Sequence, residues 1–184
     1  LCLSGFISAI GTVMLPKVSR MTRMKQMDAV KRHIRLSMEL VMCMVCAMAF
    51  GLAAVAVNFA PLFYGDDFAY SGTLMMPLAF TLLSIGFANV IRTQWVLPQG
   101  RDTIFVHSVL TGAVINLIAN FVLIPPFGAM GAAAATVLAE FSVPAVQFVY
   151  LRKELPYAQY LKTTGVYCLF GLVMAGVVAL LGYV

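Results

Sequence analysis

The sequence predicts an all-α, polytopic bundle of membrane helices, and its composition, its apolar runs and the placement of its basic residues all favour this class. Hydrophobic residues make up 62% of the 184 positions and charged residues only 10%, against about 25% charged residues in a soluble globular domain. Several apolar runs approach the ~20 residues that a helix needs to cross a bilayer. We therefore expect about five full spans and one partial span.

The expected spans are apolar runs bounded by proline, glycine or charged residues. The first run is too short to cross the hydrocarbon core alone. No basic stretch precedes it and no cleavage pattern follows it, so we interpret it as the tail of a truncated helix rather than a signal peptide. The expected spans are residues 1–16 (partial), 34–60, 70–96, 103–124, 129–151 and 165–184.

Proline and glycine residues mark features within and between these spans. Pro77 is expected to kink its span, which a membrane helix tolerates when neighbouring groups satisfy the freed carbonyl. The short connection at 97–102 requires the two helices that it joins to be antiparallel neighbours. The small residues at 131–135, Gly-Ala-Ala-Ala-Ala, allow another helix backbone to approach closely.

The basic residues are placed as a membrane topology requires. The expected loops 17–35, 97–102 and 152–164 would share one side of the membrane and, together with Arg92, hold all 12 Lys and Arg residues. The loops on the other side, 61–69 and 125–128, hold none. By the positive-inside rule the basic loops are expected to be cytoplasmic. The net charge of +5 is therefore assigned to topology rather than to nucleic-acid binding.

Three segments in a fixed order resemble a known family of transporters. Residues 13–19 read VMLPKVS, residues 94–101 read QWVLPQGR, and residues 112–140 read GAVINLIANFVLIPPFGAMGAAAATVLAE. Together they resemble the polysaccharide-transporter (O-antigen flippase) branch of the multidrug/oligosaccharidyl-lipid/polysaccharide exporter superfamily. The resemblance implies two helical lobes with a cavity between them at membrane depth and transport by alternating access. Residues 1–184 would then be a fragment forming most of the C-terminal transmembrane lobe.

The resemblance implies flipping of undecaprenyl-diphosphate-linked oligosaccharide from the cytoplasmic to the periplasmic leaflet of a bacterial inner membrane. This step would serve surface polysaccharide biosynthesis (O-antigen, capsule or exopolysaccharide), with lipid-linked oligosaccharide, membrane lipid and the polymerase and ligase machinery as partners. The alternative is export of drugs or of the peptidoglycan lipid precursor on the same scaffold. A membrane-embedded glycan or phosphoalcohol transferase is less favoured, because such chemistry needs clustered acids or histidines near an interface.

We therefore expect a transporter and not an enzyme, with no cofactor and no metal site; a coupling cation, proton or sodium, stays open. Glu140 lies about 11 residues into its expected span, roughly 17 Å from the outer surface and so near the midplane. It could line the substrate path, bind the coupling cation, relay a proton or serve as a structural carboxyl. Asn116 and Asn120 share one helix face and could bond to a neighbouring helix or to sugar hydroxyls.

Arg92, Glu39 and His107 are expected at one depth near the inner ends of their spans. Arg92 could pair with Glu39, meet the diphosphate of a lipid carrier, or extend its charged end to the interface. Gln94 lies beside Arg92 and is a further candidate for the cavity wall. His107 is expected to be an interfacial residue rather than a site residue.

The loop or surface helix at 17–35 carries seven basic residues and one acid. Its charge is expected to fix the topology and to contact anionic headgroups. A second role, gathering the anionic lipid carrier near the cavity mouth, stays open. The basic residues are Lys17, Arg20, Arg23, Lys25, Lys31, Arg32 and Arg35.

Overall fold

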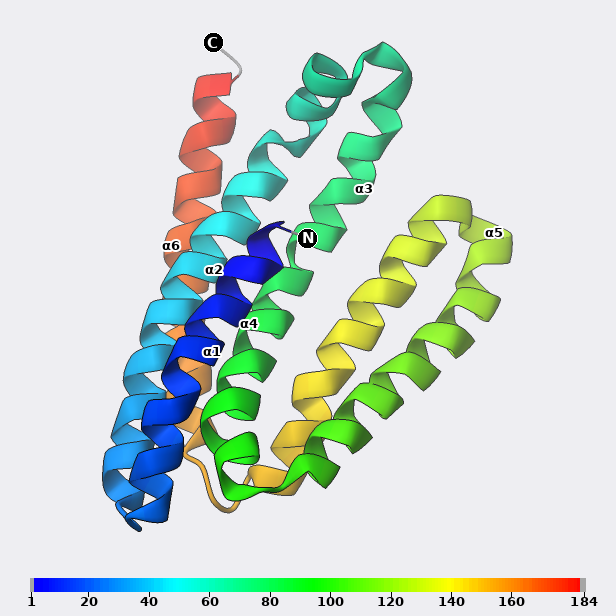
Figure 1. The fold of residues 1–184 in the computed structure, drawn as a ribbon. Coiled ribbons are helices and arrows are strands. Elements are labelled where there is room, and N and C mark those ends of the chain that lie inside the picture. Colours follow the sequence, from blue (N-terminus) through cyan, green and yellow to red (C-terminus); the bar gives the residue numbers. More distant parts are fainter. Residues whose placement is uncertain (1, 183–184) are drawn as a thin grey trace.

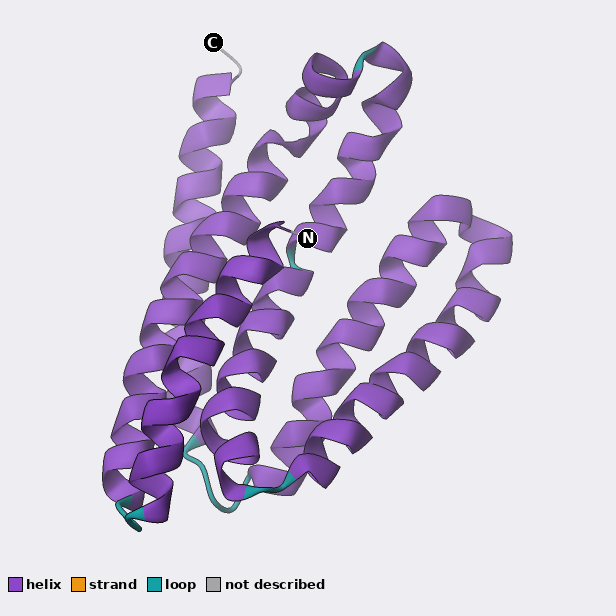
Figure 2. Ribbon diagram, in the orientation of Figure 1, coloured by secondary structure: helices purple, strands orange, loops and turns teal. Residues whose placement is uncertain are grey.

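The computed structural model describes residues 2–182, and in this part of the chain it contains helices and no strands (Figure 2). The all-α prediction is confirmed. The longer helices are α1 (Cys2–Arg23), α2 (Met27–Tyr64), α3 (Ala69–Ala79), α4 (Thr81–Ile91), α5 (Asp102–Leu151) and α6 (Tyr157–Gly182). Short turns of helix, η1 (Asp66–Phe68), η2 (Arg92–Val96) and η3 (Leu97–Gln99), connect them.

Within residues 2–182, four helical stretches are long and apolar enough to cross a membrane: Met27–Tyr64, Tyr70–Gln99, Asp102–Leu151 and Tyr157–Leu181. The stretch Asp102–Leu151 is a hairpin rather than one rod, because its backbone breaks at Gly128 with φ 57° and ψ −131°. Glycine tolerates positive φ without a steric penalty. Figure 1 shows the two arms of α5 folding back on one another, so the expected spans 103–124 and 129–151 lie in these two arms.

The basic segment is more helical than a loop. Helix α1 runs on through Arg23 and α2 begins at Met27, so only residues 24–26 form the turn between them, with Lys25 at φ 56°. Lysine, arginine and methionine are good helix formers, which allows both helices to continue beyond their apolar runs. At ~1.5 Å per residue the 38 residues of α2 extend about 57 Å, well beyond the hydrocarbon core.

The three basic connections lie at one end of the bundle, the lower end in Figure 1, which we call the basic end. Here α1, α2, α4 and the start of α6 enclose the apolar core. Its fully buried members include Val18, Ile34, Met38, Met42, Ile91 and Tyr160. Helix α2 runs through the middle of this bundle, whereas the α5 hairpin leans away from it and meets α4 (Figure 1).

The stretch from α3 to η3 changes its helical geometry three times. Pro77 precedes the break between α3 and α4, where the Phe80 amide donates to the Pro77 carbonyl at 3.2 Å. At the basic end α4 widens into one π-helical turn, Arg92–Val96, in which the Leu97 amide donates to the Arg92 carbonyl. The turn ends at Gly100, which adopts φ 66°. These changes place Arg92 and Trp95 at the junction of the bundle and the hairpin.

Candidate functional site

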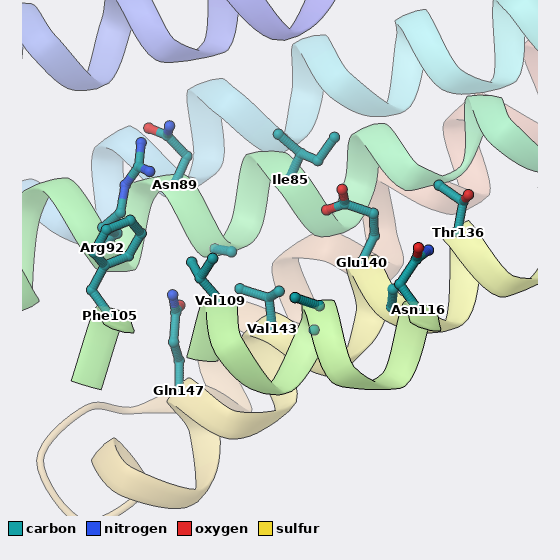
Figure 3. A pocket seen from close by; sticks show the side chains of 14 residues that line it. Ile85, Asn89, Arg92, Phe105, Val109, Asn116, Thr136, Glu140, Val143 and Gln147 are labelled. Atoms are coloured by element: carbon teal, nitrogen blue, oxygen red, sulfur yellow. The ribbon is translucent and has the colours of Figure 1, made fainter. Parts of the chain in front are cut away.

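A polar cavity of about 430 Å³ lies between α4 and the two arms of α5 (Figure 3). Its walls combine apolar side chains, such as Ile85, Phe105 and Val143, with polar ones from all three helical segments. The polar lining residues are Asn89, Arg92, Asn116, Thr136, Glu140 and Gln147. Three of the five residues proposed from the sequence for the cavity wall, Arg92, Asn116 and Glu140, therefore line one cavity.

One end of the cavity is cationic and rich in hydrogen-bond donors. The Arg92 guanidinium carbon lies 5.1 Å from the centroid of the Phe105 ring, close enough for a cation–π contact. The Nε of Arg92 and the Oε1 of Gln147 are buried and find no hydrogen-bond partner among the described residues. Asn89 lies one turn before Arg92 on the same helix face. The free Nε of Arg92 can therefore donate to an anion, while the free Oε1 of Gln147 can accept a hydrogen bond from a hydroxyl of the same occupant.

The other end of the cavity carries the carboxylate. Figure 3 shows Glu140, Asn116 and Thr136 together, away from Arg92 and Gln147. Gln147 follows Glu140 by seven positions on α5, which places the two ends about 10 Å apart at ~1.5 Å per residue. An occupant that fills the cavity would therefore meet cationic and acidic groups at different points along its length.

Asn120 and Gln94 lie outside the cavity wall. The Asn120 Nδ2 donates to Asn116 Oδ1 at 2.9 Å, a bond within one helix turn that holds the Asn116 side chain. Gln94 is fully buried in η2, whose residues from Thr93 to Val96 are all enclosed. Its expected place beside Arg92 on the cavity wall is corrected, because neighbouring helical residues point in different directions.

The structure also corrects the pair considered between Arg92 and Glu39. Glu39 Oε1 accepts instead from Arg35 Nε at 3.1 Å, one turn earlier on α2. Equal depth in the membrane did not reveal which face of each helix carries the charge. His107 is exposed, and its Nδ1 lies 3.0 Å from the Tyr150 hydroxyl on the other arm of α5.

Sequence reasoning did not single out Asn89, Thr136 or Gln147. A periodicity signal was available for each of them. Gln147 lies seven residues after Glu140, and Asn89 three residues before Arg92, so each shares a helix face with a candidate already chosen. Thr136 lies four residues before Glu140 and follows the same rule.

Below the cationic end, an ionic cluster ties the hairpin to the bundle. Glu154 Oε2 accepts from Arg101 Nη1 at 2.6 Å and from Trp95 Nε1 at 3.1 Å, while Lys31 Nζ lies 6.0 Å from the Trp95 ring centroid. Burial alone would raise the pKa of Glu154, but the bonds from Arg101 and Trp95 and the charges of Arg101 and Lys31 outweigh it. The pKa of Glu154 is therefore lowered.

The family model described as lipid II flippase MurJ matches residues 1–184, the whole chain. The chain belongs to the MurJ lipid II flippase family. This membership confirms the resemblance to the exporter superfamily and, with the four candidate spans, identifies a multi-pass membrane protein. A flippase family points to a transporter rather than to a catalytic enzyme.

Curated relatives of this MurJ-family chain align over most of it. A "Putative O-antigen transporter" of Shigella dysenteriae is 22% identical over 127 residues, 69% of this chain and 31% of the relative. A "Probable low-salt glycan biosynthesis flippase Agl15" of Haloferax volcanii is 24% identical over 133 residues, 72% of the chain and 28% of the relative.

An "Uncharacterized membrane protein MJ1068" of Methanocaldococcus jannaschii is 26% identical over 153 residues, 83% of the chain and 30% of the relative. The chain thus spans between 28% and 31% of these three relatives. No solved structure matches the chain.

Proposed function

We propose that the protein containing this chain flips undecaprenyl-diphosphate-linked oligosaccharide from the cytoplasmic to the periplasmic leaflet of a bacterial inner membrane by alternating access. The product would feed surface polysaccharide biosynthesis and its polymerase and ligase machinery. The observation that carries the proposal is Arg92, a cation on the wall of a polar cavity between membrane helices, whose buried Nε has no hydrogen-bond partner among the residues that the structure describes. Relatives named as an O-antigen transporter and a glycan flippase support an oligosaccharide substrate.

Arg92 is suited to the diphosphate of the carrier. A guanidinium presents several donors in a planar fork that matches phosphate oxygens, and its charge strengthens each bond. Gln147 and Asn89 lie at the same end and offer amide groups to the remaining oxygens or to the first sugar. The Phe105 ring beneath the guanidinium keeps it from folding away from the cavity.

The acidic end of the cavity is suited to sugar hydroxyls. The Glu140 carboxylate accepts hydrogen bonds, and the Asn116 amide both donates and accepts them. Because this end lies about 10 Å from Gln147 along α5, it would meet the glycan when Arg92 holds the diphosphate. Glu140 is also the proposed place for a coupling proton or cation.

The basic segment supports the proposed orientation. Its residues Lys17, Arg20, Arg23, Lys25 and Arg32 are exposed around the turn between α1 and α2. On a cytoplasmic face they would attract anionic headgroups and concentrate an anionic lipid carrier near the Arg92 end of the cavity. The substrate would enter from the side on which its diphosphate is first bound.

The peptidoglycan lipid precursor is the second candidate substrate, and the description of the matching family as a lipid II flippase favours it. Both candidates carry a polyprenyl diphosphate, so Arg92 has the same role in each. They differ in the group that meets the Glu140 end. Transport of both substrates by the full-length protein in proteoliposomes would decide between them, and a deletion strain with normal surface glycan would count against the oligosaccharide.

Substitution of Arg92 tests the proposed site. We expect Arg92→Ala to raise the half-saturating concentration of lipid-linked oligosaccharide about 10- to 100-fold, because a charge-assisted bond contributes about 1.5–3 kcal/mol. Arg92→Lys should lie between wild type and Arg92→Ala, because an ammonium lacks the fork geometry. The matched control is Arg152→Ala, an exposed cation at the same end of the bundle. Wild-type transport by Arg92→Ala would remove the assigned role.

A further inference from the structure

Helix α5 has a gap in its hydrogen bonding at the residue that carries the cavity carboxylate. Pro144 has no backbone N–H, so it cannot donate to the carbonyl four residues earlier. That carbonyl belongs to Glu140, whose side chain lines the polar cavity. The gap therefore falls on the backbone of a candidate site residue.

A hydroxyl from another helix fills this gap. Ser84 Oγ on α4 donates to the Glu140 carbonyl oxygen, across 56 positions of sequence. Other small hydroxyls act differently: Ser108, Thr136 and Ser142 each bond to a carbonyl three or four residues earlier in their own helix. The Ser84 bond thus links α4 to α5 where α5 cannot complete its own ladder.

The surroundings of this bond leave the Glu140 carbonyl few other partners. Ser84 is 3% exposed. A second cavity of about 410 Å³ adjoins it, and that cavity is lined mainly by apolar groups including Phe87, Phe141 and Pro144. A carbonyl that loses its donor next to such walls stays unsatisfied, which is costly in an apolar environment.

Helix α4 is itself held against the bundle, so Ser84 acts from a fixed wall. A Cβ at Gly86 would lie 2.9 Å from Val45 Cγ2 and 3.2 Å from Met42 Cε, which shows how closely α4 packs on α2. The same helix continues to Asn89 and Arg92 at the cationic end. Ser84 therefore sets the position of the Glu140 segment relative to the residues that face it across the cavity.

We propose that Ser84 is a positioning residue of the cavity: its hydroxyl replaces the bond that Pro144 cannot make and thereby holds Glu140 in register with Asn89 and Arg92. This role rests on the proposed function for its effect on transport. Its structural part concerns only the placement of Glu140. The two parts can be tested in one set of variants of the full-length protein.

The test is a double-mutant cycle on Ser84 and Pro144. In Pro144→Ala the restored N–H can donate to the Glu140 carbonyl, so the Ser84 hydroxyl should become dispensable. The first measurement is the rate at which an apolar carbodiimide labels Glu140 in membrane vesicles, followed by mass spectrometry of the peptide. We expect Ser84→Ala to change this rate about three- to tenfold, and to change it little in the Pro144→Ala background.

Two further variants separate positioning from a general loss of packing. Ser84→Thr keeps the hydroxyl and should retain the wild-type labelling rate. Ser142→Ala removes a hydroxyl that bonds within α5, at 2.6 Å from the Ala139 carbonyl, and should leave the rate unchanged. An equal effect of Ser84→Ala in both Pro144 backgrounds, or an unchanged labelling rate in Ser84→Ala, would overturn the proposal.

Transport of lipid-linked oligosaccharide supplies the second measurement. Ser84→Ala should raise the half-saturating concentration about three- to tenfold with a smaller change in the maximal rate, and Pro144→Ala should suppress this effect. If the effect of Ser84→Ala on labelling depends on Pro144 but the protein does not transport this substrate, the proposed function is overturned and the positioning of Glu140 is supported. If the wild type transports the substrate but the labelling effect does not depend on Pro144, the positioning role is overturned and the proposed function is supported.

Discussion

The central helix α2 and the α5 hairpin are both long and apolar, yet they are held in the molecule in different ways. In the apolar part of α2, 44% of the residues are buried, whereas in the apolar part of α5 only 11% are buried. Helix α2 is fixed by side-chain packing along its length. The hairpin is held at fewer points: Ile104 and Leu151 join the apolar core at its two ends, Ser84 bonds to Glu140, and Trp95 bonds to Glu154 in the following connection.

This difference assigns different mechanical roles to the two walls of the cavity. Close packing leaves α2 and its neighbour α4 few alternative arrangements, because packed interiors resist small displacements. A hairpin that is held by a few separate contacts can shift when one of its hydrogen bonds breaks and another forms. We infer that α4 is the fixed wall and α5 the adjustable one, and the following predictions test this contrast.

The largest effect is expected where two bundle helices touch by their backbones. A Cβ at Gly72 in α3 would lie 2.6 Å from the Ala56 carbonyl oxygen and 2.9 Å from Val57 Cα of α2. Neither atom can move without shifting a helix, so Gly72→Ala should lower the free energy of unfolding by about 1–3 kcal/mol. Thermal unfolding of the full-length protein in detergent measures the change.

Two other glycines provide comparisons for the stability cost of Gly72→Ala. In the hairpin, a Cβ at Gly112 would meet the Val143 side chain at 3.0 Å, which can give way, so Gly112→Ala should cost less. Gly176 on α6 has nothing within 4 Å of such a Cβ, and Gly176→Ala should be neutral or gain up to about 1 kcal/mol from helix propensity. A larger cost at Gly112 than at Gly72 would contradict the contrast between bundle and hairpin.

An intermediate effect is expected at the ionic cluster. Glu154→Gln should cost about 1 kcal/mol, because both Glu154 and Arg101 are roughly one-third exposed and solvent screens the pair. The lowered pKa of Glu154 gives this contribution a pH dependence: it is fully present above the ordinary value of 4.5 and is lost as the pH falls through the lowered pKa of the folded state.

Unfolding temperatures measured across the acidic range would show this loss. The difference in unfolding temperature between wild type and Glu154→Gln should be constant near neutral pH and should disappear below pH 4.5. Lys153→Gln, an exposed neighbour in the same connection, is the control and should show no such change with pH. A difference that widened as the pH fell would contradict the assigned sign.

The smallest effect is expected at the pair that joins the two arms of the hairpin. Tyr150→Phe removes the hydroxyl that lies 3.0 Å from His107 Nδ1. Because both side chains are exposed, the change in unfolding free energy should stay below about 1 kcal/mol. A cost above that of Glu154→Gln would show that the hairpin arms are tied together more strongly than the hairpin is tied to the bundle.

The fold class could be predicted because apolar run length and charge placement are properties of composition along the chain. Helix ends were harder, since the helices α1 and α2 continue through basic residues that were expected to leave the membrane. The length of an apolar run shows which residues can lie in the hydrocarbon core. The helix itself ends only where the backbone can no longer form its i to i+4 hydrogen bonds. The breaks at Gly128 and after Pro77 follow such failures directly.

The polar cavity could be predicted only in part. Depth selected Arg92, Glu140 and Asn116, which the structure brings to one cavity. Depth alone could not give the rotation of each helix, so it left open a pair between Arg92 and Glu39 that the structure does not form, and it placed Gln94 on the wall. The bond from Ser84 was inaccessible, because it joins positions 56 residues apart.

The π-helical turn at Arg92–Val96 has a consequence for the evolution of this sequence. A π turn holds one residue more than the α-helical bonding pattern would, so deletion of a single residue here could restore α-helical bonding without breaking the helix. Because the wider π turn takes up its additional residue within one turn, the side chains on either side would keep their relative directions. A one-codon deletion could thus alter the residues of the turn, among them Arg92 and Trp95, while leaving Asn89 in place on the cavity wall.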